Sequence, residues 1–127
     1  MPITGQGQKV LVVDDEPIIR MLVMEALEDG RYSGIEASDG AAALKILQSE
    51  PGVEMLITDV GLPGGMNGRQ LADAGRVSRP DLKVLFITGY AEKSVIGDGD
   101  LATGMQILTK PFAMETLTRK IRDMVEA

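Results

Sequence analysis

Several side chains that could act as metal ligands, nucleophiles or charge donors occur directly at or after the ends of short apolar runs. Four such runs end in carboxylates, a hydroxyl or an amine, in this order: Asp14-Asp15-Glu16, Asp59, Thr88 and Lys110. Carboxylates held a few ångströms apart repel one another unless a cation joins them. Mg²⁺ suits such a site, because it takes carboxylates, a carbonyl and water and readily adds a phosphate oxygen. Brought together, these groups would supply a metal site, a nucleophilic carboxylate and a positive charge for a phosphoryl group.

The composition removes several other kinds of chemistry. Histidine and cysteine are absent from the 127 residues, which excludes disulfides, thiol catalysis and Cys/His zinc sites. The net charge of −6 argues against a nucleic-acid partner. No signal peptide and no apolar run near membrane-spanning length is visible, so we expect a cytoplasmic chain with no membrane partner.

Each motif taken alone has a plainer explanation. Asp14-Asp15-Glu16 before Pro17 could simply cap a helix, and we give capping and function equal weight for that motif. An aspartate at a strand end is more often a turn residue, and a lone Lys-Pro is usually a loop. The conjunction at successive strand ends favours function, because capping does not require a lysine opposite the acids.

Strand and helix patterns alternate five times along the chain. Apolar runs predict strands over residues 9–13, 32–37, 53–58, 82–88 and 105–109. Helical spacing predicts helices over residues 17–30, 39–47, 70–77 (weak) and 114–124, and a doubtful one after Tyr90. We assign residues 8–126 to one domain and expect residues 1–7 to be a flexible N-terminal segment.

This alternation is typical of an α/β fold. We expect a doubly wound, flavodoxin-like sheet of five parallel strands, with right-handed crossovers that place helices on both faces. Such folds bind ligands beyond the carboxyl ends of their strands. The carboxylates, the hydroxyl and the amine named above follow those ends.

The chain resembles the bacterial response regulator receiver domains over nearly its whole length. The resemblance rests on LVVDDEP, ITDVGLPGGMNG, LFITGYA and LTKPF, which occur in the family's order and close to its spacing. It implies that Asp59 accepts a phosphoryl group with Mg²⁺ as cofactor. The implied metal ligands are Asp14, Asp15, Asp59 and the backbone carbonyl of Gly61. It further implies that Thr88 and Lys110 contact the phosphoryl group, and that the Lys110-Pro111 bond is cis.

The chain departs from the family pattern at three places. Gly68 comes nine residues after Asp59 instead of eight, as in receivers attached to or encoded beside sensor kinases. Ile107 replaces the usual aromatic on the fifth strand. Glycines between residues 94 and 104 make a poor fourth helix, which we expect to be short, displaced or disordered and to become ordered on phosphorylation. Tyr90 either tunes phosphoryl hydrolysis or is merely a loop aromatic.

The resemblance implies a signalling domain that is not a conventional enzyme. It would take its phosphoryl group from a histidine kinase or phosphotransfer protein, catalyse its own phosphorylation and dephosphorylation, and act on a downstream protein. A stand-alone regulator and a fragment of a hybrid kinase both remain open. Two rivals also remain: a pseudo-receiver that only binds, and an aspartyl-phosphate phosphohydrolase. The second usually has another Asp two residues after the nucleophile, where this chain has Gly61.

Overall fold

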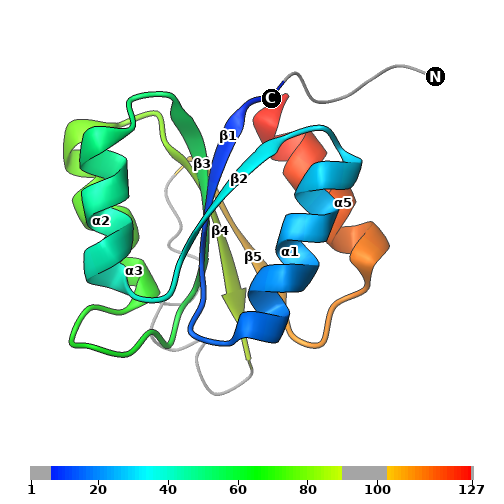
Figure 1. Ribbon diagram of the computed structural model, residues 1–127, viewed down its shortest axis with the longest axis horizontal. Coiled ribbons are helices and arrows are strands. Elements are labelled where there is room, and N and C mark those ends of the chain that lie inside the picture. The colour runs from blue at the N-terminus through cyan, green and yellow to red at the C-terminus, as the bar shows by residue number, and fades with distance from the viewer. Residues whose placement is uncertain (1–6, 90–102, 127) are drawn as a thin grey trace.

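The computed structural model describes residues 7–89 and 103–126 (Figure 1). Its elements, in chain order, are β1 (Lys9–Val13), α1 (Pro17–Asp29), β2 (Ser33–Ala37), α2 (Gly40–Ser49), β3 (Val53–Asp59), α3 (Gly68–Ser78), β4 (Lys83–Thr88), β5 (Met105–Thr109) and α5 (Met114–Val125). The predictions on Tyr90 and on most of residues 94–104, including the fourth helix, lie outside the described residues. The expected flexible end lies outside them as well, apart from Gly7.

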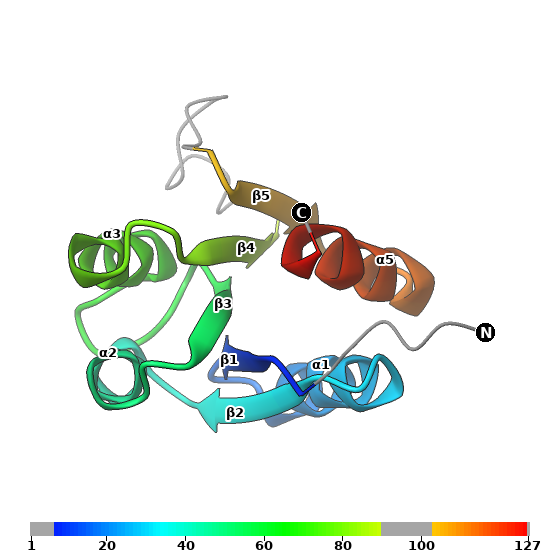
Figure 2. The same ribbon diagram turned by 90° about the horizontal axis from the view of Figure 1, so that it is seen from above.

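The five strands form one parallel sheet in the order β2-β1-β3-β4-β5. Helices α1 and α5 cover one face, and α2 and α3 cover the other (Figure 2). The doubly wound α/β fold predicted from the alternation of strands and helices is therefore confirmed. The order reverses between β1 and β3, and the carboxyl ends of all strands lie at one edge of the sheet, the lower one in Figure 1. Ligands of such folds bind near that reversal.

Two apolar cores fill the spaces between the sheet and its helices. Successive side chains of a strand point to opposite faces, so Leu11 and Val13 enter the core under α2 and α3, whereas Val10 and Val12 enter the core under α1 and α5. All four are buried. This explains why the central strands β1, β3 and β4 are mostly apolar: both of their faces are covered.

Helix α3 is longer than the sequence pattern predicted. We expected a weak helix over residues 70–77, but it begins at Gly68 because Asn67 and Gln70 form a capping box. The Asn67 side chain accepts from the Gln70 amide at 2.8 Å, and the Gln70 side chain accepts from the Asn67 amide at 3.0 Å. An Asn three residues before a Gln was a readable signal for this start.

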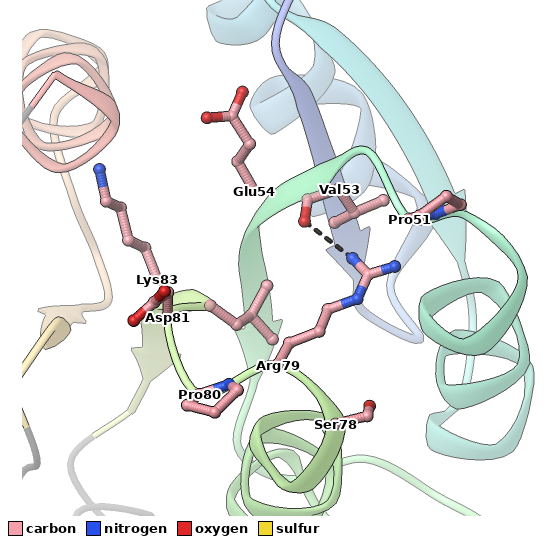
Figure 3. A pocket seen from close by; sticks show the side chains of 9 residues that line it. Pro51, Val53, Glu54, Ser78, Arg79, Pro80, Asp81 and Lys83 are labelled. Carbon is pink, nitrogen blue, oxygen red and sulfur yellow. Dashed lines mark hydrogen bonds between the residues drawn. The ribbon is translucent and has the colours of Figure 1, made fainter.

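The opposite edge of the sheet, at the amino ends of β3 and β4, is held by an arginine. Arg79 follows α3, and its guanidinium donates to the carbonyl of Val53 at 2.8 Å (Figure 3). It also donates to the carbonyl of Glu50. Glu50 closes the C-terminus of α2, whose last carbonyls lack helical partners. One side chain thus joins the ends of α2 and α3 to the first residue of β3.

Candidate functional site

Asp14 extends β1 by one residue at the carboxyl edge of the sheet. Its amide donates to the carbonyl of Ala37 at 3.3 Å, and its Oδ1 accepts the amide of Glu16 at 2.8 Å. The side chain is buried, and among the described residues its Oδ2 has no hydrogen-bond partner. A buried carboxylate oxygen without a donor is costly unless a cation or proton joins it. Asp14 therefore caps the turn with one oxygen and offers the other to a ligand.

Asp59 is the last residue of β3 and is also buried. β3 lies between β1 and β4, so Asp59 emerges beside Asp14 at the point where the strand order reverses. Carboxylate oxygens of Asp14, Asp15 and Asp59 all lie within 4.8 Å of one another, with Asp15 exposed to solvent. The predicted convergence of these three acids is therefore observed. Such an oxygen cluster could hold a hard cation.

Lys110 lies opposite the acids, immediately after β5. Its Nζ is 3.6 Å from Asp59 Oδ1 and 3.4 Å from Glu16 Oε1. The Lys110 amide donates to the carbonyl of Thr88 at 2.8 Å, and the Lys110-Pro111 bond is cis, as expected. The Glu16 contact was missed by the sequence analysis, which grouped that residue with the acids. One ammonium is thus shared between a buried and an exposed carboxylate.

Thr88 is the last residue of β4 and is fully buried. It pairs with Thr109 on β5, and its hydroxyl donates to the carbonyl of Gly89 at 3.0 Å. Ile107, which stands where an aromatic is usual, pairs with Phe86 and packs against the core under α2 and α3. Gly61, two residues after Asp59, is exposed, and the role of its carbonyl as a metal ligand stays a prediction.

Burial and charge shift two pKa values at this site. Burial raises the pKa of the Asp14 carboxyl from 3.8 to about 6; the Glu16 amide opposes this rise, and the Asp59 carboxylate adds to it. Burial lowers the pKa of Lys110, but Asp59, Asp14 and Glu16 outweigh it and raise that pKa above 10.5. The site therefore holds more negative charge than one lysine compensates.

Comparison with known proteins decides the family. The sequence model of the family described as response regulator receiver domain matches residues 10–122 of this chain. The chain belongs to this family. The receiver protein CpdR of Brucella abortus is 34% identical, with 94% of this chain and 98% of that protein covered. The sensor kinase CckA of Brucella abortus is also 34% identical over 92% of this chain, which spans only 12% of that kinase. A receiver protein from Sinorhizobium medicae has a TM-score of 0.82 at 26% identity, covering 96% of this chain and 97% of that one.

The loop after Asp59 carries the extra residue of this receiver domain. Gly64 and Gly65 have φ of 85° and 88°, a left-handed conformation that side chains other than glycine rarely adopt. The following Met66 packs against Gly40 at the start of α2, where a Cβ would come within 3.1 Å of its side chain. The two glycines turn the longer loop so that Met66 anchors it to the core under α2 and α3.

Gly68 is needed for close packing and not for an unusual φ. A Cβ on Gly68 would overlap the carbonyl oxygen of Asp59 and lie 3.0 Å from Val60 Cα. Both are backbone atoms, which cannot swing aside. We expect Gly68→Ala to lower the free energy of unfolding in urea by about 1–3 kcal/mol. Gly52→Ala is the matched control, since its Cβ would come no closer than 3.5 Å to the Lys9 side chain. Equal stability of the two variants would contradict the packing argument.

Proposed function

We propose that this receiver domain, residues 8–126, accepts a phosphoryl group on Asp59 in a Mg²⁺-dependent reaction and so transmits a two-component signal. One observation carries the proposal: the buried Asp59 has the Lys110 ammonium at 3.6 Å and Asp14 and Asp15 beside it. A carboxylate so placed can attack phosphorus while the Lys110 ammonium stabilises the phosphoryl oxygens on one side. On the other side, a cation held by Asp14 and Asp15 would do the same.

The proposed metal ligands are Asp15, Asp59 and the Gly61 carbonyl, with Asp14 acting partly through water. The donor set fits Mg²⁺, because it contains only oxygen and includes Asp14 Oδ2, which has no hydrogen-bond partner in the described part of the chain. When bound, Mg²⁺ would neutralise the charge that gathers on the transferred group. We assign no other cofactor.

The residues of the chain would act as follows. An Asp59 carboxylate oxygen forms the bond to phosphorus as the bond from phosphorus to the donor's imidazole nitrogen, or to acetate, breaks and the leaving group keeps the electron pair. The Lys110 ammonium moves from Glu16 and Asp59 onto a phosphoryl oxygen. The Thr88 hydroxyl leaves the Gly89 carbonyl and donates to another phosphoryl oxygen. Water then attacks phosphorus, the bond from phosphorus to Asp59 breaks, and the Asp59 carboxylate is restored as inorganic phosphate leaves.

The intact mass of the purified chain, measured after incubation with acetyl phosphate, tests the proposal. With Mg²⁺ present we expect the mass of one phosphoryl group to be added, and with EDTA in place of Mg²⁺ we expect none. Absence of any gain would favour the pseudo-receiver. Sustained turnover of a phosphoester would favour the phosphohydrolase, although Gly61 stands where that class has its acid/base.

The phosphodonor we propose is a histidine kinase or a phosphotransfer protein. Since the chain has no histidine, the donor must lie outside it. An apolar groove of about 470 Å³, between α1 and the start of α5, adjoins Lys110 and is lined by Ile19, Leu22, Lys110, Pro111, Phe112 and Met114. Ile18 and Met21 lie exposed on α1 nearby. Exposed apolar side chains beside a reacting group fit a protein donor. Such kinases draw on ATP, which would place the exchange in the cytoplasm.

Met21→Glu should distinguish a protein donor from a small one. A charge placed in the apolar contact should slow phosphotransfer from a phosphorylated histidine phosphotransfer protein by about tenfold. Phosphorylation by acetyl phosphate should not change, because Met21 is not part of the acid cluster. Val77→Glu, on α3, is the control: Val77 is also exposed and the charge change is the same. Equal slowing by both variants would contradict docking over α1.

Among the described residues, no helix has the length and apolar character needed to cross a membrane.

A further inference from the structure

We propose that Arg20 is a positioning residue for the metal site, acting through the backbone carbonyl of Asp14. Arg20 Nη1 donates to that carbonyl at 2.6 Å, and Arg20 Nε donates to Glu36 Oε1 at 3.2 Å. The side chain thus spans from α1 across the end of β1 to β2. This inference rests on the function proposed above and assigns part of its geometry to a residue outside the acid cluster.

The contact is effective because of where the carbonyl lies. The Asp14 carbonyl belongs to the peptide group that joins the two acids Asp14 and Asp15. Peptide groups are planar, so fixing one carbonyl also fixes the direction of the following amide and the start of Asp15. Asp15 is exposed, and its carboxylate accepts no hydrogen bond from the described residues. Its place in the acid cluster therefore depends on its backbone.

Two other polar groups of Asp14, its amide and Oδ1, already hold this turn, whereas Oδ2 has no hydrogen-bond partner among the described residues. The Asp14 amide donates to Ala37 at 3.3 Å, and Oδ1 accepts from Glu16 at 2.8 Å. The guanidinium supplies the remaining restraint, on the carbonyl side. Groups that orient metal ligands in this way commonly change metal affinity by about 10- to 100-fold when they are removed.

Arginine suits this task better than lysine. Its planar guanidinium can donate in two directions at once, here to a carbonyl and to a carboxylate. The pair with Glu36 holds it in place, and the Arg20 side chain is only 20% exposed. A lysine would keep the positive charge but could not make both contacts with the same geometry.

The test compares four variants of the whole chain. Arg20→Met removes both contacts, and Arg20→Lys keeps the charge. Glu36→Gln weakens the ion pair but leaves the contact with the Asp14 carbonyl. Arg122→Met is the control for the lost charge, because Arg122 lies at the end of α5 and pairs only with its neighbour Asp123 at 3.7 Å among the contacts of the described residues.

Two measurements are made on each protein: Mg²⁺ affinity by isothermal titration calorimetry, and the amide ¹⁵N and ¹H shifts of Asp15 and Glu16 in EDTA. We expect Arg20→Met to weaken Mg²⁺ binding at least about tenfold, with Arg20→Lys in between. Glu36→Gln and Arg122→Met should stay within about threefold. The Asp15 and Glu16 signals should shift in both Arg20 variants before any metal is added, and not in Arg122→Met.

The inference would be wrong if Arg20→Met bound Mg²⁺ with wild-type affinity. It would also be wrong if Arg20→Met lost no more Mg²⁺ affinity than Arg122→Met. Wild-type Mg²⁺ affinity and wild-type amide shifts in Arg20→Lys would show that the positive charge alone matters, which would also overturn the inference. This comparison still decides the question if Arg20→Met fails to fold. If the wild-type chain binds no Mg²⁺, the proposed function fails. The Asp15 and Glu16 shifts in EDTA then decide the positioning role by themselves.

Discussion

Asp59→Asn should abolish the Mg²⁺-dependent gain of a phosphoryl group from acetyl phosphate. The lone pair of an amide nitrogen is delocalised into its carbonyl, so asparagine cannot replace the carboxylate as a nucleophile. The exchange keeps the size of the side chain, so the buried position at the end of β3 remains filled. Intact mass before and after incubation measures the result directly, and no partner kinase is needed because acetyl phosphate is the donor.

Glu54→Gln is the matched control for this experiment. Glu54 is on the same strand as Asp59, is exposed, and loses the same charge. It should be phosphorylated at the wild-type rate. A phosphoryl group on Asp59→Asn would show that another carboxylate accepts it, and the assignment of Asp59 would then be wrong.

Asp14→Asn should stabilise the metal-free protein at neutral pH and abolish its Mg²⁺ binding. The pKa of Asp14 is raised from 3.8 to about 6, which means that folding disfavours its ionised form. Each pKa unit corresponds to about 1.4 kcal/mol, so the ionised carboxylate costs up to about 3 kcal/mol. Asparagine removes the charge while its Oδ1 can still accept the Glu16 amide.

The sign of the pH dependence follows from the raised pKa. Between pH 3.8 and about 6 the folded protein binds this proton more tightly than the unfolded chain. The cost of Asp14 is therefore fully present above pH 6 and disappears as the pH falls toward 3.8. The stability advantage of Asp14→Asn in EDTA should shrink over the same interval when urea unfolding is followed from pH 8 down to pH 4.

Asp14→Ala separates charge from capping, the alternative left open by the sequence. Alanine also removes the charge but loses the bond to the Glu16 amide, at a cost of about 1 kcal/mol. It should therefore be less stable than Asp14→Asn and still at least as stable as the wild type without metal. Added Mg²⁺ should raise the melting temperature of the wild type alone. A clear loss of metal-free stability in both variants would mean that capping dominates at Asp14.

Local patterns were sufficient to predict the fold and the members of the acid cluster. The central strands β1, β3 and β4 are mostly apolar because helices cover both faces of the sheet, and this made them predictable from a single sequence. Once the strands are parallel, their carboxyl ends share one edge, so Asp14 and Asp59 must approach each other. The helical pattern of α3 predicted a start near residue 70, but the helix begins at Gly68 because of the Asn67–Gln70 capping box, which the prediction had overlooked.

Contacts between distant elements could be decided only by the tertiary structure. Lys110 is shared by Glu16 and Asp59 because the segments that follow β1, β3 and β5 meet at the carboxyl edge of the sheet. Gly68 is required because α3 begins against the Asp59 carbonyl, and Arg20 reaches the Asp14 carbonyl because α1 folds back over β1. Residue types and spacing determine which groups reach the edge of the sheet. Their burial, charge and orientation depend on the elements that cover them, and these come from other parts of the chain.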